Sequence, residues 1–344
     1  MIPVLFSVLN MSSNFSEIGS EFWIESIPEQ LLTERDGVYA LSGRTAIDLI
    51  LQDILRQKQV ETVAMPAWCC DSMVAPFVAH GIEVLFYEGN DLPKTDIFYL
   101  TNYFGYENIL PLDMMKAVKG QGSIVLYDRT HSFLMEDEPY QKFADYHFAS
   151  IRKWMGVVGG ALIVGLTESP KLKDCLFAPE KEMAMIDKYR YLQGDKTIVK
   201  DNFLAAFGAF GHKLADDYCN YEMDNLSYTL YKQTDIKEMK RKRKENAAYI
   251  HENLKGLQFM YSQTENAVPL FVPVLFESKE QRDFVRKKLI EQQIYCPVHW
   301  PQPKQIPAEF QVNDIVSREL SIICDQRYGL NEMKRIIKVI HQNI

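Results

Sequence analysis

Short apolar runs alternate with amphipathic segments along the first half of the chain. Apolar residues at helical spacing follow Ser42, and this pattern predicts a helix that opens at 42–46. Apolar runs predict strands at 60–65, 82–87, 96–100 and 123–127, with a helix at about 71–80 between the first two. Because helical crossovers connect parallel strands, the alternation predicts an α/β fold with a mainly parallel sheet.

The alternation of predicted strands and helices changes after residue 147. Residues 147–150 lead to Lys153, and 159–165 form the pattern of a strand returning from it. The segment from about 180 to 253 is largely helical in pattern, and strand, helix, strand and helix follow at 268–276, 280–292, 295–299 and 331–342. We therefore expect a large α/β domain at 1–230, with an irregular N-terminal arm, and a small C-terminal α/β domain at 231–344.

Charge and hydropathy narrow the class of protein. A net charge of −8 disfavours a general nucleic-acid binder, which needs a basic face. The one basic run, 240–244, has acidic residues close by and predicts a solvated helix face. The apolar stretch 155–166 is about half the length that spans a bilayer and is broken by glycines, so it predicts a buried strand. We expect no membrane partner, and residues 1–10 lack the basic start and cleavage site of a secretory signal.

Cysteine usage points to a reducing compartment. The six cysteines form no CxxC pair and no His/Cys spacing typical of a metal site. Adjacent Cys69 and Cys70 cannot easily bridge to each other. We expect reduced thiols, a cytoplasmic location and no metal site.

Two side chains at strand ends have the chemistry of a cofactor site. Asp128 follows the strand 123–127, where open α/β sheets form ligand crevices, although an aspartate here is also a common cap. Lys153 stands 25 residues later. A lysine in a partly desolvated crevice loses its charge readily, as Schiff-base formation requires, and Arg152 would act in the same direction. Enzymes that use pyridoxal 5′-phosphate (PLP) hold it through a lysine and keep its pyridine nitrogen protonated with an acid.

The helix start after Ser42 is a candidate phosphate cradle. Gly43, Arg44 and Thr45 begin this helix, where free backbone N–H groups and the helix dipole favour an anion. The side chains of Thr45 and Ser150 would add donors, whereas an ordinary cap at Ser42 is the alternative. The glycine motifs of dinucleotide-binding and P-loop proteins are absent from the sequence.

Two aromatic side chains are candidates to contact a cofactor ring. Trp68 follows the strand 60–65 and starts the next helix, so it faces the crevice or packs in the core. His131 comes three residues after Asp128 and would hydrogen-bond to the ring or stack on it, unless it is a simple loop histidine.

In their order and spacing, the segments 42–46, 66–68, 128–131 and 150–153 resemble the sugar aminotransferases of the DegT–DnrJ–StrS group, PLP-dependent enzymes of fold type I. The likeness extends from about residue 17 to the end. It implies an internal aldimine at Lys153, which is also the general acid and base. Asp128 would pair with the pyridine nitrogen and His131 would lie against the ring. The resemblance implies that the phosphate is held by Gly43, Arg44, Thr45 and Ser150.

The resemblance also implies a homodimer in which each active site is completed by the partner subunit. Asn202 roughly matches an asparagine that reaches the phosphate of the partner. His299, in the segment 295–300 that looks like the family's substrate loop, is a candidate substrate contact. Pro297 and Pro301 also give that loop a purely structural reason to exist.

The chain departs from the family where the ring and substrate would lie. The family places an aromatic residue four positions after the proline, where Cys70 stands here, so either Trp68 or Cys70 faces the cofactor. Phe148 replaces the usual serine five positions before the lysine, and Val158 stands in the family's glycine-rich segment after it. These differences indicate a divergent branch with its own substrate.

The leading hypothesis is a PLP-dependent aminotransferase. An amino acid such as glutamate would donate the amino group, and a keto-sugar, for example a nucleotide-linked one in polysaccharide or secondary-metabolite biosynthesis, would accept it. Two alternatives stay open: another fold-type-I reaction such as that of a lyase or dehydratase, and a non-catalytic PLP-binding regulatory protein. A lysine at position 153, where dehydratase relatives carry histidine, favours transamination.

Overall fold

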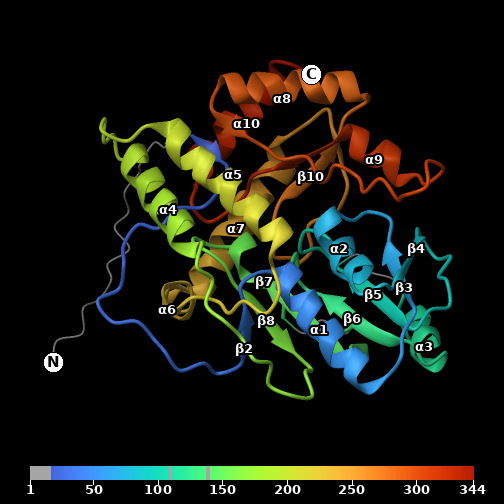
Figure 1. Cartoon of the computed structure of the whole chain (residues 1–344). Helices are drawn as coiled ribbons and strands as arrows, with labels where there is room; N and C mark the ends of the chain where they lie inside the picture. The colour runs from blue at the N-terminus through green and yellow to red at the C-terminus, as the bar shows by residue number, and fades with distance from the viewer. Residues whose placement is uncertain (1–16, 108–110, 137–139) are drawn as a thin grey trace.

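A seven-stranded sheet forms the centre of the computed structural model, which describes residues 17–107, 111–136 and 140–344 (Figure 1). Its strands are β2 (Val38–Ala40), β3 (Thr62–Pro66), β4 (Glu83–Tyr87), β5 (Ile97–Thr101), β6 (Ile124–Asp128), β7 (Tyr146–Ser150) and β8 (Ala161–Val164). They lie in the order β2-β8-β7-β6-β5-β3-β4. Strands β3 to β7 are parallel, β8 pairs antiparallel with β7, and the edge strand β2 pairs antiparallel with β8. The predicted α/β fold with a mainly parallel sheet is confirmed.

Helices cover both faces of this sheet. Helices α1 (Gly43–Gln57) and α2 (Asp71–Ala79) pack on one face, and α3 (Leu112–Gly120) packs on the other. Strand β5 is buried on both sides, so its alternate residues divide between the two layers. Tyr99 joins the cluster under α1 and α2, while Phe98 and Leu100 join the one under α3.

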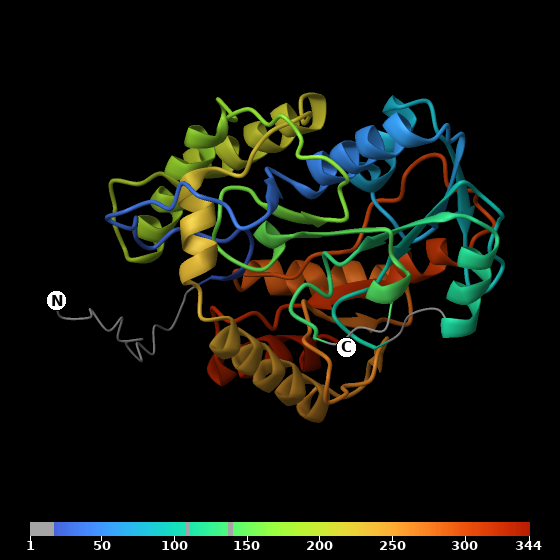
Figure 2. The same cartoon turned by 90° about the horizontal axis from the view of Figure 1, so that it is seen from below.

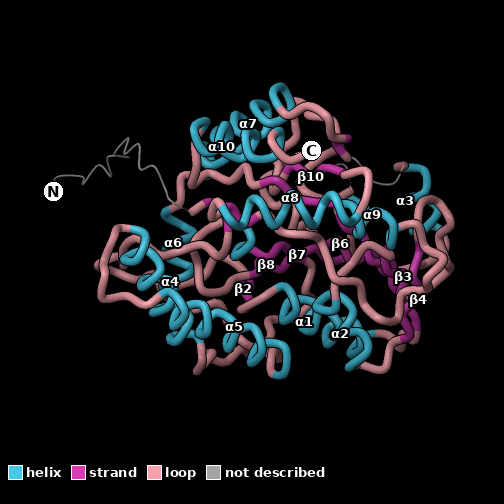
Figure 3. The backbone as a smooth tube through the Cα atoms, turned by 90° about the horizontal axis from the view of Figure 1, so that it is seen from above, coloured by secondary structure: helices cyan, strands magenta, loops and turns pink. Residues whose placement is uncertain are grey.

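Four helices occupy the segment that was predicted to be largely helical. They are α4 (Ala178–Leu192), α5 (Lys200–Asp216), α6 (Asn225–Gln233) and α7 (Ile236–Asn253). Helix α7 lies on the other side of the central sheet from α1 and α2, as Figures 2 and 3 show. The seven-stranded sheet is therefore covered by helices on both faces.

The C-terminal part has a small sheet of its own. Strands β9 (Gln258–Phe259), β10 (Val272–Leu275) and β12 (Glu319–Ile322) are antiparallel in the order β12-β10-β9. Around them lie α8 (Lys279–Glu291), the short α9 (Val312–Arg318) and α10 (Leu330–His341). Met333, Ile336, Ile337 and Ile340 bury one face of α10, at the spacing expected of an amphipathic helix.

The predicted strand 295–299 is wrong beyond its first residue. Only β11 (Ile294–Tyr295) forms, and it pairs in parallel with β1 (Ile18–Gly19) from the N-terminal segment. Pro297 has no N–H to give to a ladder, and the N–H of His299 donates to the Glu319 carboxylate instead. The N-terminal segment thus crosses to the C-terminal part, while the predicted features of residues 1–10 lie outside the described residues.

The basic run in α7 is a solvated face only in part. Arg241 pairs with acidic neighbours on the surface, but Arg243 is fully buried. Its guanidinium donates to the carbonyl oxygens of Pro269, Leu270 and Trp154. The prediction was wrong at this residue because helical spacing places Arg243 on the same inward face as the buried Met239 and Ala247.

The apolar stretch 155–166 forms a strand only at β8, and the residues before it make the turns behind Lys153. In the described part of the chain, no helix combines the length and the apolar character needed to cross a membrane.

Candidate active site

A cavity of about 190 Å³ lies where β5, β6 and β7 end and α1 begins. Carboxyl ends of neighbouring parallel strands meet there, as in other open α/β sheets. Residues from nine places along the chain line it: Glu21; Ser42, Gly43, Arg44 and Ile47; Cys70, Ser72 and Met73; Thr101; Asp128, Thr130 and His131; Phe148, Ser150, Arg152 and Lys153; Lys181; Phe207, Phe210, Gly211 and Leu214; and Trp300.

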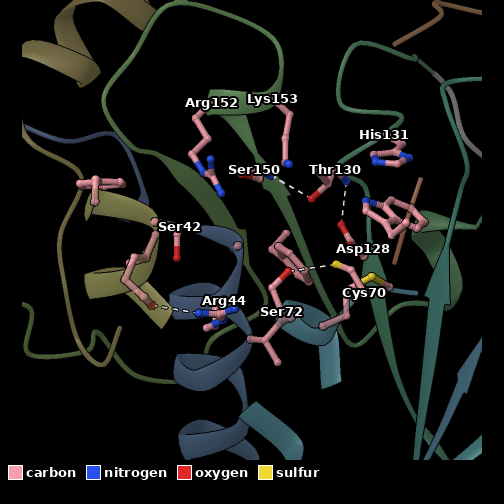
Figure 4. Close-up of a pocket in the computed structure, with 18 of the residues that line it drawn as sticks. Ser42, Arg44, Cys70, Ser72, Asp128, Thr130, His131, Ser150, Arg152 and Lys153 are labelled. Atoms are coloured by element: carbon pink, nitrogen blue, oxygen red, sulfur yellow. Dashed lines mark hydrogen bonds between the residues drawn. The ribbon is translucent and has the colours of Figure 1, made fainter. Parts of the chain in front are cut away.

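Lys153 ends a single 3₁₀ turn, Ile151–Lys153, that directly follows β7. The side chains of Lys153 and Arg152 leave this turn side by side and project into the cavity (Figure 4). The next residue, Trp154, is fully buried, and its indole N–H donates to the carbonyl of Thr130 at 2.6 Å. The turn that carries Lys153 is therefore anchored from behind.

A second anchor of this turn comes from the C-terminal part of the chain. Arg243 and the Gln326 side-chain amide both donate to the carbonyl oxygen of Trp154, at 3.3 and 2.7 Å. The Arg243 guanidinium also lies 4.6 Å from the centroid of the Trp154 ring system. Because these groups hold the residue that follows Lys153, α7 and the loop after β12 fix the lysine backbone.

The Lys153 amine lies among groups that disfavour its charge. Desolvation lowers the pKa of Lys153, and the neighbouring Arg152 lowers it further, against the opposing effect of carboxylates that include Asp128. The side chain is nevertheless open to the cavity. A neutral amine that can reach a ligand is the form that attacks a carbonyl carbon.

Asp128 ends β6 and faces the same cavity. The Tyr99 hydroxyl donates to one carboxylate oxygen at 2.7 Å, and the Thr130 N–H donates to the other at 2.8 Å. Burial raises the pKa of Asp128 despite these donors and the nearby Lys153. A cationic N–H on a ligand would offset that desolvation, so the carboxylate is suited to pair with one. Sequence reasoning missed Tyr99, since an apolar strand gives no sign of which tyrosine reaches a carboxylate.

His131 forms one wall of the cavity and is neutral. Burial lowers the pKa of His131 to about 3, helped by the positive charge of Lys153. The Phe104 N–H lies 3.3 Å from Nδ1 and donates to it. Trp300 stacks on the His131 ring, with 5.4 Å between the ring centroids and 28° between the planes. These flat groups present the apolar surface that an aromatic ligand ring needs.

Among the described residues, the first N–H groups of α1, where a phosphate cradle was predicted, have no backbone partner within the helix. The first intrahelical bond runs from Ala46 to Ser42, and the Ser42 hydroxyl accepts from the Thr45 N–H, so the N–H groups of Gly43 and Arg44 remain available. A Cβ on Gly43 would lie 3.5 Å from that of Ser150, which places the Ser150 side chain beside the helix start. This arrangement suits a phosphate.

Two arginines on the cavity have unsatisfied nitrogen atoms. Within the described residues, the Nε atoms of Arg44 and Arg152 are buried without a hydrogen-bond partner. The terminal nitrogen of Arg44 donates to the Leu214 carbonyl at 3.0 Å. Both side chains line the cavity, so their guanidinium groups place two positive charges on its wall.

Of three other residues predicted to contact the cofactor, one lines the cavity and two do not. Thr45 is buried and its hydroxyl bonds to Ser42 at 2.9 Å, so it does not line the cavity. Trp68 also lies outside the lining: its indole N–H donates to the His299 carbonyl, and its ring stacks on Tyr103. Of the two candidates after Pro66, Cys70 is the one that reaches the cavity, with its sulfur 3.0 Å from the Ser72 hydroxyl.

Two further predicted contacts lie away from the lining. His299 is buried behind the cavity and bonds through Nδ1 to the Ser321 hydroxyl at 2.8 Å, while the next residue, Trp300, lines the cavity. Asn202 is exposed in the first turn of α5. It does not reach the cavity of its own chain.

Sequence reasoning missed one wall entirely. Glu21 comes from the N-terminal segment, Lys181 from α4, and Phe207 and Phe210 from α5. The only sequence sign of this wall is the apolar face of α5, because the pairing of a buried lysine with a distant glutamate depends on how the segments pack.

Comparisons of the sequence with protein-family models and with curated proteins find no match. Solved structures do match. The aminotransferase PseC of Helicobacter pylori, involved in the biosynthesis of pseudoaminic acid, has a TM-score of 0.67 at 13% identity over 95% of this chain and 99% of its own. Sugar aminotransferase CalS13 of Micromonospora echinospora has a TM-score of 0.61 at 12% identity, over 89% and 87%. NtdA of Bacillus subtilis, solved with bound cofactor PMP, has a TM-score of 0.60 at 15% identity, over 89% and 72%.

The sequence identity of these three proteins to this chain, 12 to 15%, is too low to transfer an activity. The structural match nevertheless covers 89 to 95% of this chain. The chain therefore has the fold of these solved structures, which is the fold that its sequence motifs implied.

Proposed function

We propose that the protein is a PLP-dependent aminotransferase, a divergent relative of the DegT–DnrJ–StrS group. The observation that carries this proposal is the convergence of Lys153 and Asp128 on one cavity, where the lysine side chain is open to the cavity and the carboxylate is buried. The likeness to two structures described as aminotransferases, and to one solved with bound PMP, supports it.

Each part of PLP has a fitting group in the cavity. The phosphate would accept from the Gly43 and Arg44 N–H groups and from the Ser150 hydroxyl. The pyridine N–H would donate to Asp128, and Lys153 would attach the cofactor covalently. His131, with Trp300 behind it, and Cys70 would bound the ring.

The residues of this chain then have defined tasks. Bound PLP supplies an electron sink for the carbanion formed at the substrate Cα. Asp128 keeps the pyridine nitrogen protonated, which strengthens that sink. The Lys153 amine, once released, takes the proton from the substrate Cα atom and gives a proton to the C4′ position. Its lowered pKa suits this exchange, because the free base must be available near neutral pH.

We propose glutamate or a similar amino acid as donor and a keto-sugar as acceptor. The description of one structural neighbour as a sugar aminotransferase supports the acceptor class. A cytoplasmic location is proposed because all six cysteines are free thiols. The division into domains near residue 230 is also proposed, and a separate apolar cluster around β10, β12 and α10 supports it.

A second copy of the chain is proposed to cover α4 and α5. These helices and their flanking loops expose the apolar side chains of Leu176, Met183, Val199 and Leu204. Asn202 is exposed on the same helix, as a contact to a partner requires. Light scattering should give a solution mass of two chains, and a mass of one chain would contradict this arrangement.

Glutamate provides the direct test of the activity. Protein reconstituted with PLP should lose its visible absorption when glutamate is added in the absence of an acceptor, since the amino group moves to the cofactor and 2-oxoglutarate is released. Absorption spectra and assay of 2-oxoglutarate measure both products. If no amino donor among a panel of amino acids causes the change, the protein is another kind of PLP protein and transamination is excluded.

A further inference from the structure

We propose that Lys181 and Arg152 form the binding subsite for the carboxylate of the amino donor, and that Glu21 occupies this subsite until the donor arrives. The inference rests on the proposed function, since it assigns the donor's position at the same cavity. It concerns a wall for which the sequence offered no motif.

Lys181 is a buried cation whose ammonium has more N–H donors than its hydrogen bond to the Val158 carbonyl uses. Its side chain is 4% exposed, and its ammonium donates to the Val158 carbonyl at 3.0 Å. The aromatic ring of Phe210 lies 4.7 Å from the nitrogen. An ammonium has three N–H donors, and one neutral carbonyl does not compensate a buried charge. Burial lowers the pKa of Lys181 to about 8, so the group is still mainly cationic at neutral pH.

Arg152 supplies a second cation on the same cavity. It projects from the turn beside Lys153, and its Nε atom is buried without a hydrogen-bond partner in the described structure (Figure 4). An arginine and a lysine on one cavity wall can share a carboxylate, whose two oxygens accept several hydrogen bonds.

Glu21 is the carboxylate that faces these cations now, and its contact is loose. Its oxygen is 4.0 Å from the Lys181 nitrogen, beyond hydrogen-bonding distance, and its side chain is 48% exposed. Burial would raise the pKa of Glu21, but the surrounding cations, Lys181 first, hold it below its usual range. Glu21 is therefore an ionised group held by charge and not by direct hydrogen bonds to these cations.

The backbone of Glu21 is fixed, so only its side chain needs to move. Its carbonyl oxygen accepts from Lys188 and, at 3.1 Å, from Arg327. A change of side-chain rotamer would open the cation pair while the N-terminal segment stays in place.

The charges on the cavity wall agree with one more anion. Four cationic side chains and two carboxylates line the cavity. PLP would use Lys153 for covalent attachment, Asp128 for the ring nitrogen, and the region of Arg44 for its phosphate. Arg152, Lys181 and Glu21 are left without a role in holding PLP, so two cations face one carboxylate in this part of the cavity. The internal carboxylate and the donor's carboxylate then compete for the same cations.

If Glu21 and the donor carboxylate compete for the same cations, Glu21→Gln and Lys181→Met should change the affinity for a carboxylate in opposite directions. With PLP-loaded protein, succinate serves as an unreactive dicarboxylate probe, and its dissociation constant is measured by calorimetry. Glu21→Gln should tighten succinate binding about threefold or more, because the competing charge is removed. Lys181→Met should weaken it about tenfold or more, because a charge-assisted hydrogen bond is lost at nearly constant volume. The dissociation constant of glutamate, from the rate of the visible-absorption change, should move in the same two directions.

Lys288 and Glu291 on α8 provide a matched control. They form an exposed Lys–Glu pair, 2.9 Å apart, outside the residues that line the cavity. Lys288→Met and Glu291→Gln make the same chemical changes and should leave both dissociation constants unchanged. Thermal unfolding of each variant shows whether it is folded. Glu21 is half exposed, so Glu21→Gln tests the proposal even if Lys181→Met is unstable.

Weaker or unchanged succinate binding in Glu21→Gln would overturn the competitor role, and unchanged binding in Lys181→Met would overturn the subsite. If succinate responds as expected but glutamate does not, the cation pair serves an acidic acceptor and the assignment to the donor is wrong. The proposed function fails in a different way: the protein would take up no PLP, or PLP without attachment to Lys153, whatever the succinate data show.

Discussion

Lys153→Ala is expected to remove the visible absorption of bound PLP and to reduce kcat by a factor of at least about 10⁴. The side chain has two tasks in the proposed reaction, covalent attachment of the cofactor and transfer of the Cα proton. Alanine performs neither task, and no other described lysine shares its position at the end of β7. Absorption spectra of the purified variant and a steady-state assay with glutamate measure the two effects.

Two further variants show that the loss is specific. Lys153→Arg keeps a positive charge on the cavity but cannot form the covalent bond, so it should lose the absorption as Lys153→Ala does. Lys171→Ala removes an exposed lysine from the loop after β8 and should behave as the unmodified protein. Visible absorption that persists in Lys153→Ala would place the attachment elsewhere and end the assignment.

Asp128→Asn is expected to lower kcat by about 10²- to 10³-fold while the cofactor stays attached. The amide cannot keep a pyridine nitrogen protonated, so the electron sink weakens although the side chain keeps its size. One donor, from Tyr99 or Thr130, would also lose its acceptor, because an amide has one oxygen where the carboxylate has two. Single-turnover kinetics with glutamate separate the slowed chemical step from binding.

Tyr99→Phe gives a graded comparison for this effect. It removes one donor to Asp128 and leaves the acid itself in place. We expect a decrease of about tenfold, close to the lower end of what one hydrogen bond to a charged group contributes. An effect in Tyr99→Phe as large as in Asp128→Asn would mean that the position of the carboxylate matters more than its charge.

The sequence predicts the parts of this site that depend on local order along the chain. Asp128 and Lys153 follow apolar strands directly, and Gly43 begins an amphipathic helix, so the edge of the sheet that they share can be inferred from strand ends alone. Thr45 stands one residue after Arg44, which lines the cavity, but its hydroxyl turns to Ser42. A one-residue difference in helix phase separates a group that faces the cavity from one that is buried.

Long-range packing decides the rest. Trp68 turns from the cavity because its indole N–H finds the carbonyl of His299, which is more than two hundred residues away in the sequence. Lys181 and Glu21 come together through the crossing of the N-terminal segment to β11. For Arg243 the signal was present, since its spacing from Met239 and Ala247 marks the inner face of α7, but the surrounding basic residues hid it.

The carbonyl of Trp154 receives donors from Arg243 and Gln326, residues that belong to the C-terminal third of the chain. Opening of that third would remove both donors from the Trp154 carbonyl and would leave the turn that holds Lys153 with its Thr130 anchor alone. Local unfolding of the C-terminal part would therefore loosen the lysine backbone. The colour of the loaded protein would then report the folding of a region that does not itself hold the cofactor.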